Sequence, residues 1–303
     1  MLERMAGLRR RWVTACKLFA CTVIWCAVGI QPLMAHTLVQ DDRGVSVMFD
    51  SAPQRVISLL PAITEMWCEL GGCDRLVGVD RYSNQPERVR SLPQLGGIDD
   101  TPLERVLQLK PDLVLLAGST RLLKRMQDLG LRVMAFEPHD ASDAQRMGLA
   151  LSQVLSGTDG PWLSHLQRQN QLWSELAASV PERFRGSRLY IEVGAGPYVA
   201  AQSSFIGQAL QRVGLLSAVP GTWGVFPRLS PEWVLQDQPD WVVMGHSAEK
   251  PYKRPGWQHL KAVQRHRICV MSPEQMDALV RPGPRLHLGV QAVLSCMQKS
   301  QTP

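Results

Sequence analysis

The chain has 303 residues, of which 45% are hydrophobic and 20% charged, and its formal net charge at pH 7 is +6. That length and hydrophobic content suffice to bury two cores of roughly 120 to 130 residues each, which excludes a mainly disordered chain. Without its first 35 residues the chain keeps 28 basic and 26 acidic residues, a charge of only +2. Because binding to a polyanion needs a concentrated basic face, this balance excludes nucleic acid as a partner.

The first 35 residues have the three parts of a secretory signal peptide. A basic run ends at Arg11, an apolar run interrupted only by Lys17 reaches Ile30, and a break that ends in the small residue Ala35 follows. We expect cleavage after Ala35, so that the exported chain begins at His36. An uncleaved anchor is the alternative, because the apolar run is nearly long enough to span a bilayer.

Short apolar runs separated by helical segments fill the next part of the chain. The predicted strands are 55–60, 76–79, 114–116 and 133–136, and a predicted helix over 63–70 ends at Gly71-Gly72. Continuous apolar runs of this length belong to sheets that are covered on both faces, and parallel pairing needs crossovers. Residues 36–158 are therefore predicted to form an N-terminal α/β lobe.

A break and a long amphipathic segment follow this lobe. Gly157-Thr158-Asp159-Gly160-Pro161 interrupts the chain, and apolar residues at helical spacing then run from Trp162 to Val180. The spacing predicts a helix of about twenty residues, about 30 Å long, within residues 159–182. We expect this helix to link two domains. The alternative is an ordinary crossover helix within one large sheet.

The order of elements repeats after Pro181. Predicted strands over 189–193 and 268–271 flank a predicted helix over 206–213 that ends at Gly214. Residues 183–303 are therefore predicted to form a C-terminal α/β lobe. The expected fold class is α/β, with two lobes of mainly parallel sheet joined by one long helix.

One segment of fourteen residues occurs twice without gaps. Residues 103–116 (LERVLQLKPDLVLL) and 231–244 (PEWVLQDQPDWVVM) are identical at seven positions. Each copy predicts a helix that starts with a carboxylate, then a Pro-Asp turn and a buried strand. We expect Val106-Leu107 and Val234-Leu235 to enter the cores of two equivalent lobes.

Four cysteines follow the leader, at positions 68, 73, 269 and 296. No Cys-x-x-Cys and no Cys/His cluster with metal spacing is present, so no metal site is expected. Buried free thiols are the expected state of all four. A bridge between Cys68 and Cys73 would require the chain to turn back at Gly71-Gly72, and a pair that involves Cys296 stays open.

Five motifs in order carry a family resemblance. They are Arg55 to Gly78 with its Pro61-Ala62-x-Thr64-Glu65 turn, Arg81-Tyr82-Ser83, Gly96-Gly97, the unit from Leu103 to Val114, and Arg281-Pro282-x-Pro284-Arg285. This order resembles the periplasmic solute-binding proteins that serve ABC importers of cobalamin, siderophores and haem, and the cobalamin-binding members most. The resemblance covers nearly all of the exported chain. It implies two lobes of the helical-backbone metal-receptor type, with the ligand between them and little hinge motion.

The resemblance also implies where the ligand is held. It places aromatic contacts at Tyr82, Tyr198 and Phe226 and polar contacts at Asp277 and Arg281, and it has Ile98 where the family pattern has another aromatic residue. Aromatic rings with a few polar groups suit a large flat ligand. The expected ligand is cobalamin or a related corrinoid, with haem or a ferric siderophore as alternatives, and no other cofactor is expected.

Glu104 and Glu232 have two compatible interpretations. As structure, Thr101 and Glu104 fit a capping box, and Ser230 caps the second helix with Glu232 in its first turn. The resemblance implies that the two glutamates dock on arginines of an inner-membrane ABC permease dimer, which carries ATPase subunits. One carboxylate per lobe suits a two-subunit partner. The binding protein itself is expected to be a monomer.

Enzyme motifs are missing from the sequence. Gly194-Ala195-Gly196 follows a predicted strand, but no third glycine completes a dinucleotide fingerprint. Gly-x-Ser-x-Gly, Walker and His-Glu-x-x-His patterns do not occur. We therefore expect a binding protein and not an enzyme, with a hydrolase of unknown substrate and a structural scaffold as remote alternatives.

Overall fold

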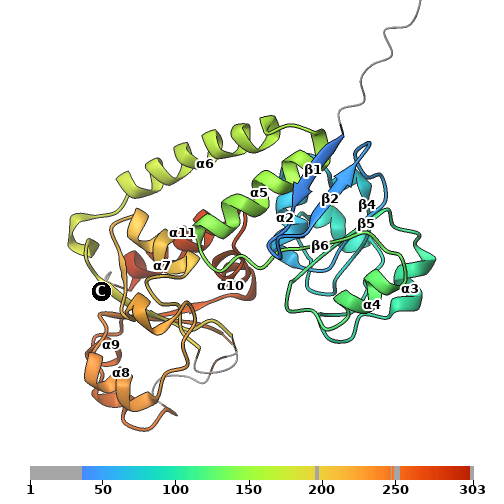
Figure 1. Ribbon diagram of the computed structural model, residues 1–303. Helices are drawn as coiled ribbons and strands as arrows, with labels where there is room; N and C mark the ends of the chain where they lie inside the picture. The colour runs from blue at the N-terminus through green and yellow to red at the C-terminus, as the bar shows by residue number, and fades with distance from the viewer. Residues whose placement is uncertain (1–35, 195–197, 247, 249–252, 301–303) are drawn as a thin grey trace, which may run out of the picture. The chain divides into compact units, whose positions relative to one another are not determined.

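The computed structural model describes residues 36–194, 198–246, 248 and 253–300 (Figure 1). The predicted signal peptide, its cleavage after Ala35 and the alternative of an uncleaved anchor all lie outside the described residues. Within the described ranges, no helix combines the length and the apolar character needed to cross a membrane.

The first lobe combines an antiparallel hairpin with a four-stranded parallel sheet in the order β4-β3-β5-β6. Its strands are β1 (Thr37–Gln40), β2 (Ser46–Phe49), β3 (Val56–Ser58), β4 (Leu76–Val79), β5 (Leu113–Leu116) and β6 (Val133–Ala135). Its helices are α2 (Pro61–Glu69), α3 (Leu103–Gln108), α4 (Leu123–Asp128) and α5 (Ala141–Ser156), with short 3-10 helices at Cys73–Arg75 and Glu87–Ser91. The strands predicted from apolar runs are the four members of the parallel sheet.

The predicted linking helix is α6 (Gly160–Ala178), a helix of 19 residues (Figure 1). It buries Trp162 near its start and Trp173 and Leu176 near its end. Trp162 belongs to the core of the first lobe, whereas Trp173 and Leu176 belong to a core of the second. Because its two ends are buried in different cores, the helix joins two lobes and is not a crossover within one sheet.

The second lobe holds a parallel sheet in the order β10-β9-β7-β8. Its strands are β7 (Arg188–Ile191), β8 (Leu216–Ser217), β9 (Trp241–Gly245) and β10 (Ile268–Met271). Its helices are α7 (Phe205–Arg212), α8 (Pro231–Asp237), α9 (Lys261–Gln264), α10 (Pro273–Val280) and α11 (Leu286–Lys299), with 3-10 helices at Glu182–Phe184, Gly221–Trp223 and Trp257–His259. The order repeats that of the first sheet, with β7 in the place of β3. The predicted fold class is confirmed.

Each parallel sheet is covered on both faces. In the first lobe, Val114 packs with Val106 of α3 on one face, and Leu115 packs with Ile63 of α2 on the other. The second lobe has the same pair of cores, one on each side of its sheet. Burial on both faces is the reason that the strands read as continuous apolar runs and not as alternating patterns.

The duplicated segment has the same local structure in both lobes. The Asp112 carboxylate accepts a hydrogen bond from the Arg55 main chain at 2.9 Å, and the Asp112 N–H donates to the Arg55 carbonyl at 2.9 Å. Asp240 makes the same two bonds with Arg188, each at 2.9 Å. Arg55 immediately precedes β3 and Arg188 begins β7. The Pro-Asp turn therefore aligns the repeated strand with its central neighbour in each sheet.

The two copies differ at their helix starts. Ser230 accepts a hydrogen bond from the Trp233 N–H at 3.3 Å, as a helix cap should. The capping box predicted for Thr101 is wrong, because its hydroxyl donates to the Gly97 carbonyl at 2.6 Å and α3 has no side-chain cap. Val106 is buried, but Leu107 is 39% exposed, so only half of that predicted core pair is correct.

The expectation of free thiols is also wrong, because all four described cysteines are bridged. Cys68 of α2 pairs with Cys73, with 4.1 Å between their Cα atoms, and Cys269 of β10 pairs with Cys296 of α11, at 5.8 Å. The first bridge forms because Gly71 takes a positive φ of 97° and turns the chain back after α2. The second joins residues that only the tertiary fold brings together.

Candidate functional site

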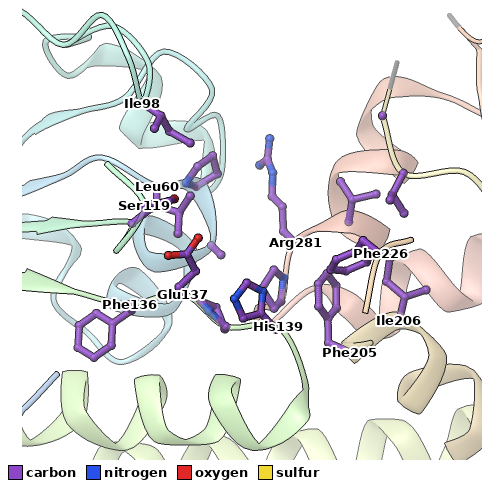
Figure 2. Close-up of a pocket in the computed structure, with 18 of the residues that line it drawn as sticks. Leu60, Ile98, Ser119, Phe136, Glu137, His139, Phe205, Ile206, Phe226 and Arg281 are labelled. Carbon is purple, nitrogen blue, oxygen red and sulfur yellow. The ribbon is translucent and has the colours of Figure 1, made fainter. Parts of the chain in front are cut away.

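A cavity of about 530 Å³ lies at the carboxyl ends of the strands of both sheets (Figure 2). Loops after β3, β4, β5 and β6 supply one wall, and the loops after β7 and β8, the start of α7 and the end of α10 supply the other. Its lining residues are Leu60, Pro61, Ala62, Ile98, Ala117, Ser119, Phe136, Glu137, Pro138, His139, Val193, Gly194, Tyr198, Phe205, Ile206, Phe226, Val280, Arg281 and Pro282. Open α/β sheets bind ligands at this edge, so the cavity is the candidate binding site.

Aromatic rings form part of the second-lobe wall. Phe226 meets Phe205 edge to face, with 5.6 Å between ring centroids, and both rings line the cavity. Ser204 holds Phe205 in place because its hydroxyl accepts from the Gly207 N–H at 3.0 Å and caps α7. The rings therefore present a fixed apolar surface to a ligand.

The structure brings together four of the six predicted ligand contacts. Ile98, Tyr198, Phe226 and Arg281 line the cavity. Tyr82, although 59% exposed, and Asp277 are not among the lining residues. The ligand-binding roles of all six stay predictions.

Arg281 has partners within the protein that its assignment as a ligand contact did not anticipate. Its guanidinium donates to Glu65 at 2.8 Å, to the Asn84 side chain at 2.8 Å and to the Tyr82 carbonyl at 3.1 Å. It also lies 2.7 Å from the Asp277 carboxylate. Only 8% of Arg281 is exposed. The side chain is thus chiefly a connector between lobes that also touches the cavity.

Glu65 is the centre of this polar contact between lobes. Its carboxylate accepts from Arg285 at 2.7 and 3.0 Å as well as from Arg281, and the Glu65 side chain is 3% exposed. Asn84 adds a bond to Asp277 at 2.8 Å. Glu65 belongs to α2 of the first lobe, whereas both arginines come from the segment after α10 of the second. The motif that contains Glu65 and the motif that contains Arg281 and Arg285 are therefore in direct contact.

A buried chain of hydroxyl groups supports the first-lobe side of this contact. Thr64 bonds to the hydroxyls of Ser58 and Ser83 at 2.8 Å each, and Ser83 bonds to the Asp80 carboxylate. Burial raises the pKa of Asp80. The Tyr82 N–H donates to the same carboxylate at 2.9 Å. These bonds fix the loop after β4, from which Tyr82 and Asn84 project.

Hydrogen bonds donated by main-chain N–H groups join the lobes near the base of the cavity. The Phe205 N–H donates to the His139 carbonyl at 3.0 Å, and the Ala141 N–H donates to the Gln208 side chain at 2.8 Å. Together with the Glu65 cluster they tie the lobes at two places besides α6. These contacts connect the two walls of the cavity.

Sequence reasoning missed several lining residues that directly follow predicted strands. Ser119 lies three residues after β5, and Glu137 and His139 follow β6. The general rule that open α/β sheets bind ligands at their strand ends would have found them, because each is a polar residue in the first turn after a buried strand. Phe205 carried no such signal.

Glu69, at the end of α2, attaches that helix to the linking helix. Its carboxylate lies 3.3 Å from His165 and accepts from Arg168 at 2.9 Å, both on α6. The hydrogen bond with His165, and then that with Arg168, lowers the pKa of Glu69 from 4.5 to about 2, although partial burial opposes the shift. The folded protein therefore favours the ionised carboxylate more than the unfolded chain does.

We expect the stability that Glu69 contributes to be full above pH 4.5 and lost as the pH falls from 4.5 to about 2. Because the carboxylate is partly exposed, the loss should be about 1 to 2 kcal/mol. Urea unfolding at successive pH values should show this slope in the wild type and a flatter one in Glu69→Gln. Glu175→Gln, an exposed change on α6, should keep the wild-type slope. Equal slopes in the wild type and Glu69→Gln would contradict the assignment.

The fold and the position of the cavity agree with what comparison with known proteins finds. The family described as "Periplasmic binding protein" matches residues 56–275, which include both parallel sheets and α6. The chain belongs to this family. The resemblance carried by the five sequence motifs is thereby confirmed.

Relatives within the periplasmic binding protein family are similar over most of their length. The uncharacterized ABC transporter substrate-binding lipoprotein YvrC of Bacillus subtilis is 26% identical over 269 residues, which cover 84% of this chain and 82% of the relative. The vitamin B12-binding protein of Pectobacterium carotovorum is 28% identical over 254 residues, which cover 80% of this chain and 88% of the relative. The solved structure of the periplasmic heme-binding protein BhuT in complex with two hemes superposes with a TM-score of 0.67 at 25% identity. The superposition covers 83% of this chain and 100% of BhuT.

Proposed function

We propose that the protein is the exported substrate-binding component of an ABC importer and that it carries cobalamin or a related corrinoid in the cavity between its lobes. The observation that supports this most is the cavity itself, whose walls come from the strand ends of both lobes. A preformed site of mainly apolar residues gains affinity because little ordering is needed on binding. The protein would hold its ligand and perform no chemistry on it.

The relatives support a tetrapyrrole-like ligand. One is named for vitamin B12 and a solved neighbour holds two hemes, so haem is the second candidate for the same cavity. The lining holds His139 and Tyr198, side chains of the kinds that ligate haem iron, so the cavity chemistry also suits haem. The amide-rich edge of a corrinoid would meet Ser119, Glu137 and His139. The first candidate is preferred because the vitamin B12-binding relative is 28% identical to this chain, against 25% for the heme-binding neighbour.

Release of the ligand would take place at the permease. Glu104 and Glu232 are both exposed in the first turns of α3 and α8, the two equivalent helices of the repeat. Hydrogen bonds from its own N–H and from Ser230 lower the pKa of Glu232, so its carboxylate stays ionised in mildly acidic medium. One exposed anion per lobe would orient the protein on a two-subunit permease that presents basic residues.

Fluorescence titration tests the proposed ligand. Tryptophan quenching with cyanocobalamin, cobinamide, haemin and ferric siderophores should be saturable, with the tightest binding for a corrinoid. Phe226→Ala should weaken that binding by about tenfold or more, because a buried aromatic contact is lost. Leu163→Ala, a change at a 61% exposed residue of α6, is the matched control and should have no effect. The absence of saturable binding to all four ligands would contradict the proposal.

A further inference from the structure

We propose that Glu137 selects the chemical class of the ligand, favouring a periphery of neutral amides over one of carboxylates. This inference rests on the proposed function and deepens it, because it separates amide-fringed corrinoids from haem and from acidic chelates. The observation that carries it is that Glu137 is the one carboxylate on the described lining of a mainly apolar cavity and has no cationic partner among the described residues.

Glu137 is held in place from two sides. Its N–H donates to the Asp42 side chain at 2.8 Å, which fixes the main chain after β6. Its carboxylate rests against Gly118, where an added Cβ would lie only 2.9 Å from Oε2. Figure 2 shows Glu137 on the first-lobe side of the cavity, across from Phe205 and Phe226. A ligand between these walls would have its edge beside the carboxylate.

The charges around the cavity leave Glu137 without a partner among the described residues. Arg281 is the one guanidinium on the described lining, and it and Arg285 face the carboxylates of Glu65 and Asp277. Two cations thus meet two anions in that cluster. Residues 195–197, beside the cavity in sequence, are Ala, Gly and Pro and bring no charge.

The ion pairs behind Glu137 add no compensating cation. Asp42, which accepts its N–H, lies 3.9 Å from Arg146, and Arg146 pairs more closely with Asp143 at 2.6 Å. This edge of the cavity is therefore acidic.

An unpaired carboxylate discriminates between ligands because it attracts amide groups and repels carboxylates. It accepts hydrogen bonds from the N–H groups of side-chain amides, such as those around a corrin ring. It repels a carboxylate brought to the same place, and the effect is strong where apolar walls exclude water. His139, exposed beside it, is a neighbouring polar group that can serve either ligand. The selection therefore comes from Glu137.

A matched pair of ligands tests the inference. Dicyanocobinamide and dicyanocobyrinic acid share the same cobalt corrin ring but carry amides or carboxylates at its edge. The wild type should bind the amide form at least about tenfold more tightly. Glu137→Gln should strengthen binding of the acid by about tenfold and weaken binding of the amide by about threefold. Glu182→Gln, the same charge change at an exposed site outside the cavity, should leave the ratio unchanged.

The outcomes separate this inference from the proposed function. If the wild type binds both corrins and Glu137→Gln changes their affinity ratio by less than twofold, the inference is wrong and the proposed function stands. A shift of equal size in Glu182→Gln would likewise overturn it, because net charge alone would then explain the preference. If the wild type binds neither corrin nor haemin, the proposed function fails and the inference with it. Thermal unfolding of each variant verifies that folding is intact.

Discussion

Glu65→Gln is expected to lower the free energy of unfolding by about 3 to 5 kcal/mol, since it removes the anion that two guanidiniums share. Arg281 and Arg285 would then lie between the lobes with Asp277 as their only carboxylate partner in the described cluster. The side chains of Arg281 and Glu65 are 9% and 3% exposed, so water cannot replace the lost contact. Urea unfolding measures the loss, and small-angle X-ray scattering should show a larger radius of gyration if the lobes separate.

Glu87→Gln is the matched control for this change. Glu87 pairs with Arg90 at 3.3 Å, but its side chain is 80% exposed, so its loss should cost about 0.5 kcal/mol or less. If Glu65→Gln is no more destabilising than Glu87→Gln, then the buried cluster does not hold the lobes together.

Replacing Glu104 and Glu232 together by Ala is expected to reduce ligand uptake in cells by about tenfold or more while leaving ligand affinity unchanged. Both carboxylates are exposed at helix starts, and neither residue lines the cavity. The expected loss lies in association with the permease, because exposed charges act mainly on orientation and encounter rate. Uptake of labelled ligand in cells and fluorescence titration of the purified protein measure the two effects separately.

A control with the same change in charge is available. Asp74→Ala with Glu182→Ala also removes one exposed carboxylate from each half of the chain, at side chains that are 86% and 91% exposed. Uptake should be near normal in this variant. Normal uptake in the Glu104/Glu232 variant would show that these glutamates only start helices and do not dock the protein.

The local pattern of the chain predicted most of the fold. The parallel strands, α6 and the repeated unit follow from apolar runs, helical spacing and turn residues, each of which acts over a few positions. The hairpin of β1 and β2 was missed, although Gly44 at a positive φ of 77° marks its turn. The strands of this hairpin are short and each has one buried residue, which makes the apolar signal weak.

Only part of the candidate site could be predicted from sequence motifs. The family resemblance placed Tyr198, Phe226 and Ile98 at the ligand site, and all three line the cavity. The pairing of Glu65 with Arg281 spans 216 residues, so no local pattern indicates it. The bridge between Cys269 and Cys296 also joins residues far apart in the chain, so no local pattern predicts it.

By itself the sequence determined two α/β lobes, a linking helix and one exposed glutamate on each copy of a repeat, because these features depend on residues close together in the chain. The tertiary structure decided which side chains meet. It placed Arg281 in a buried ion cluster between the lobes, and it left Glu137 as the unpaired charge on the described lining of the cavity. Charge compensation depends on distances between segments far apart in the chain, and folding alone sets those distances.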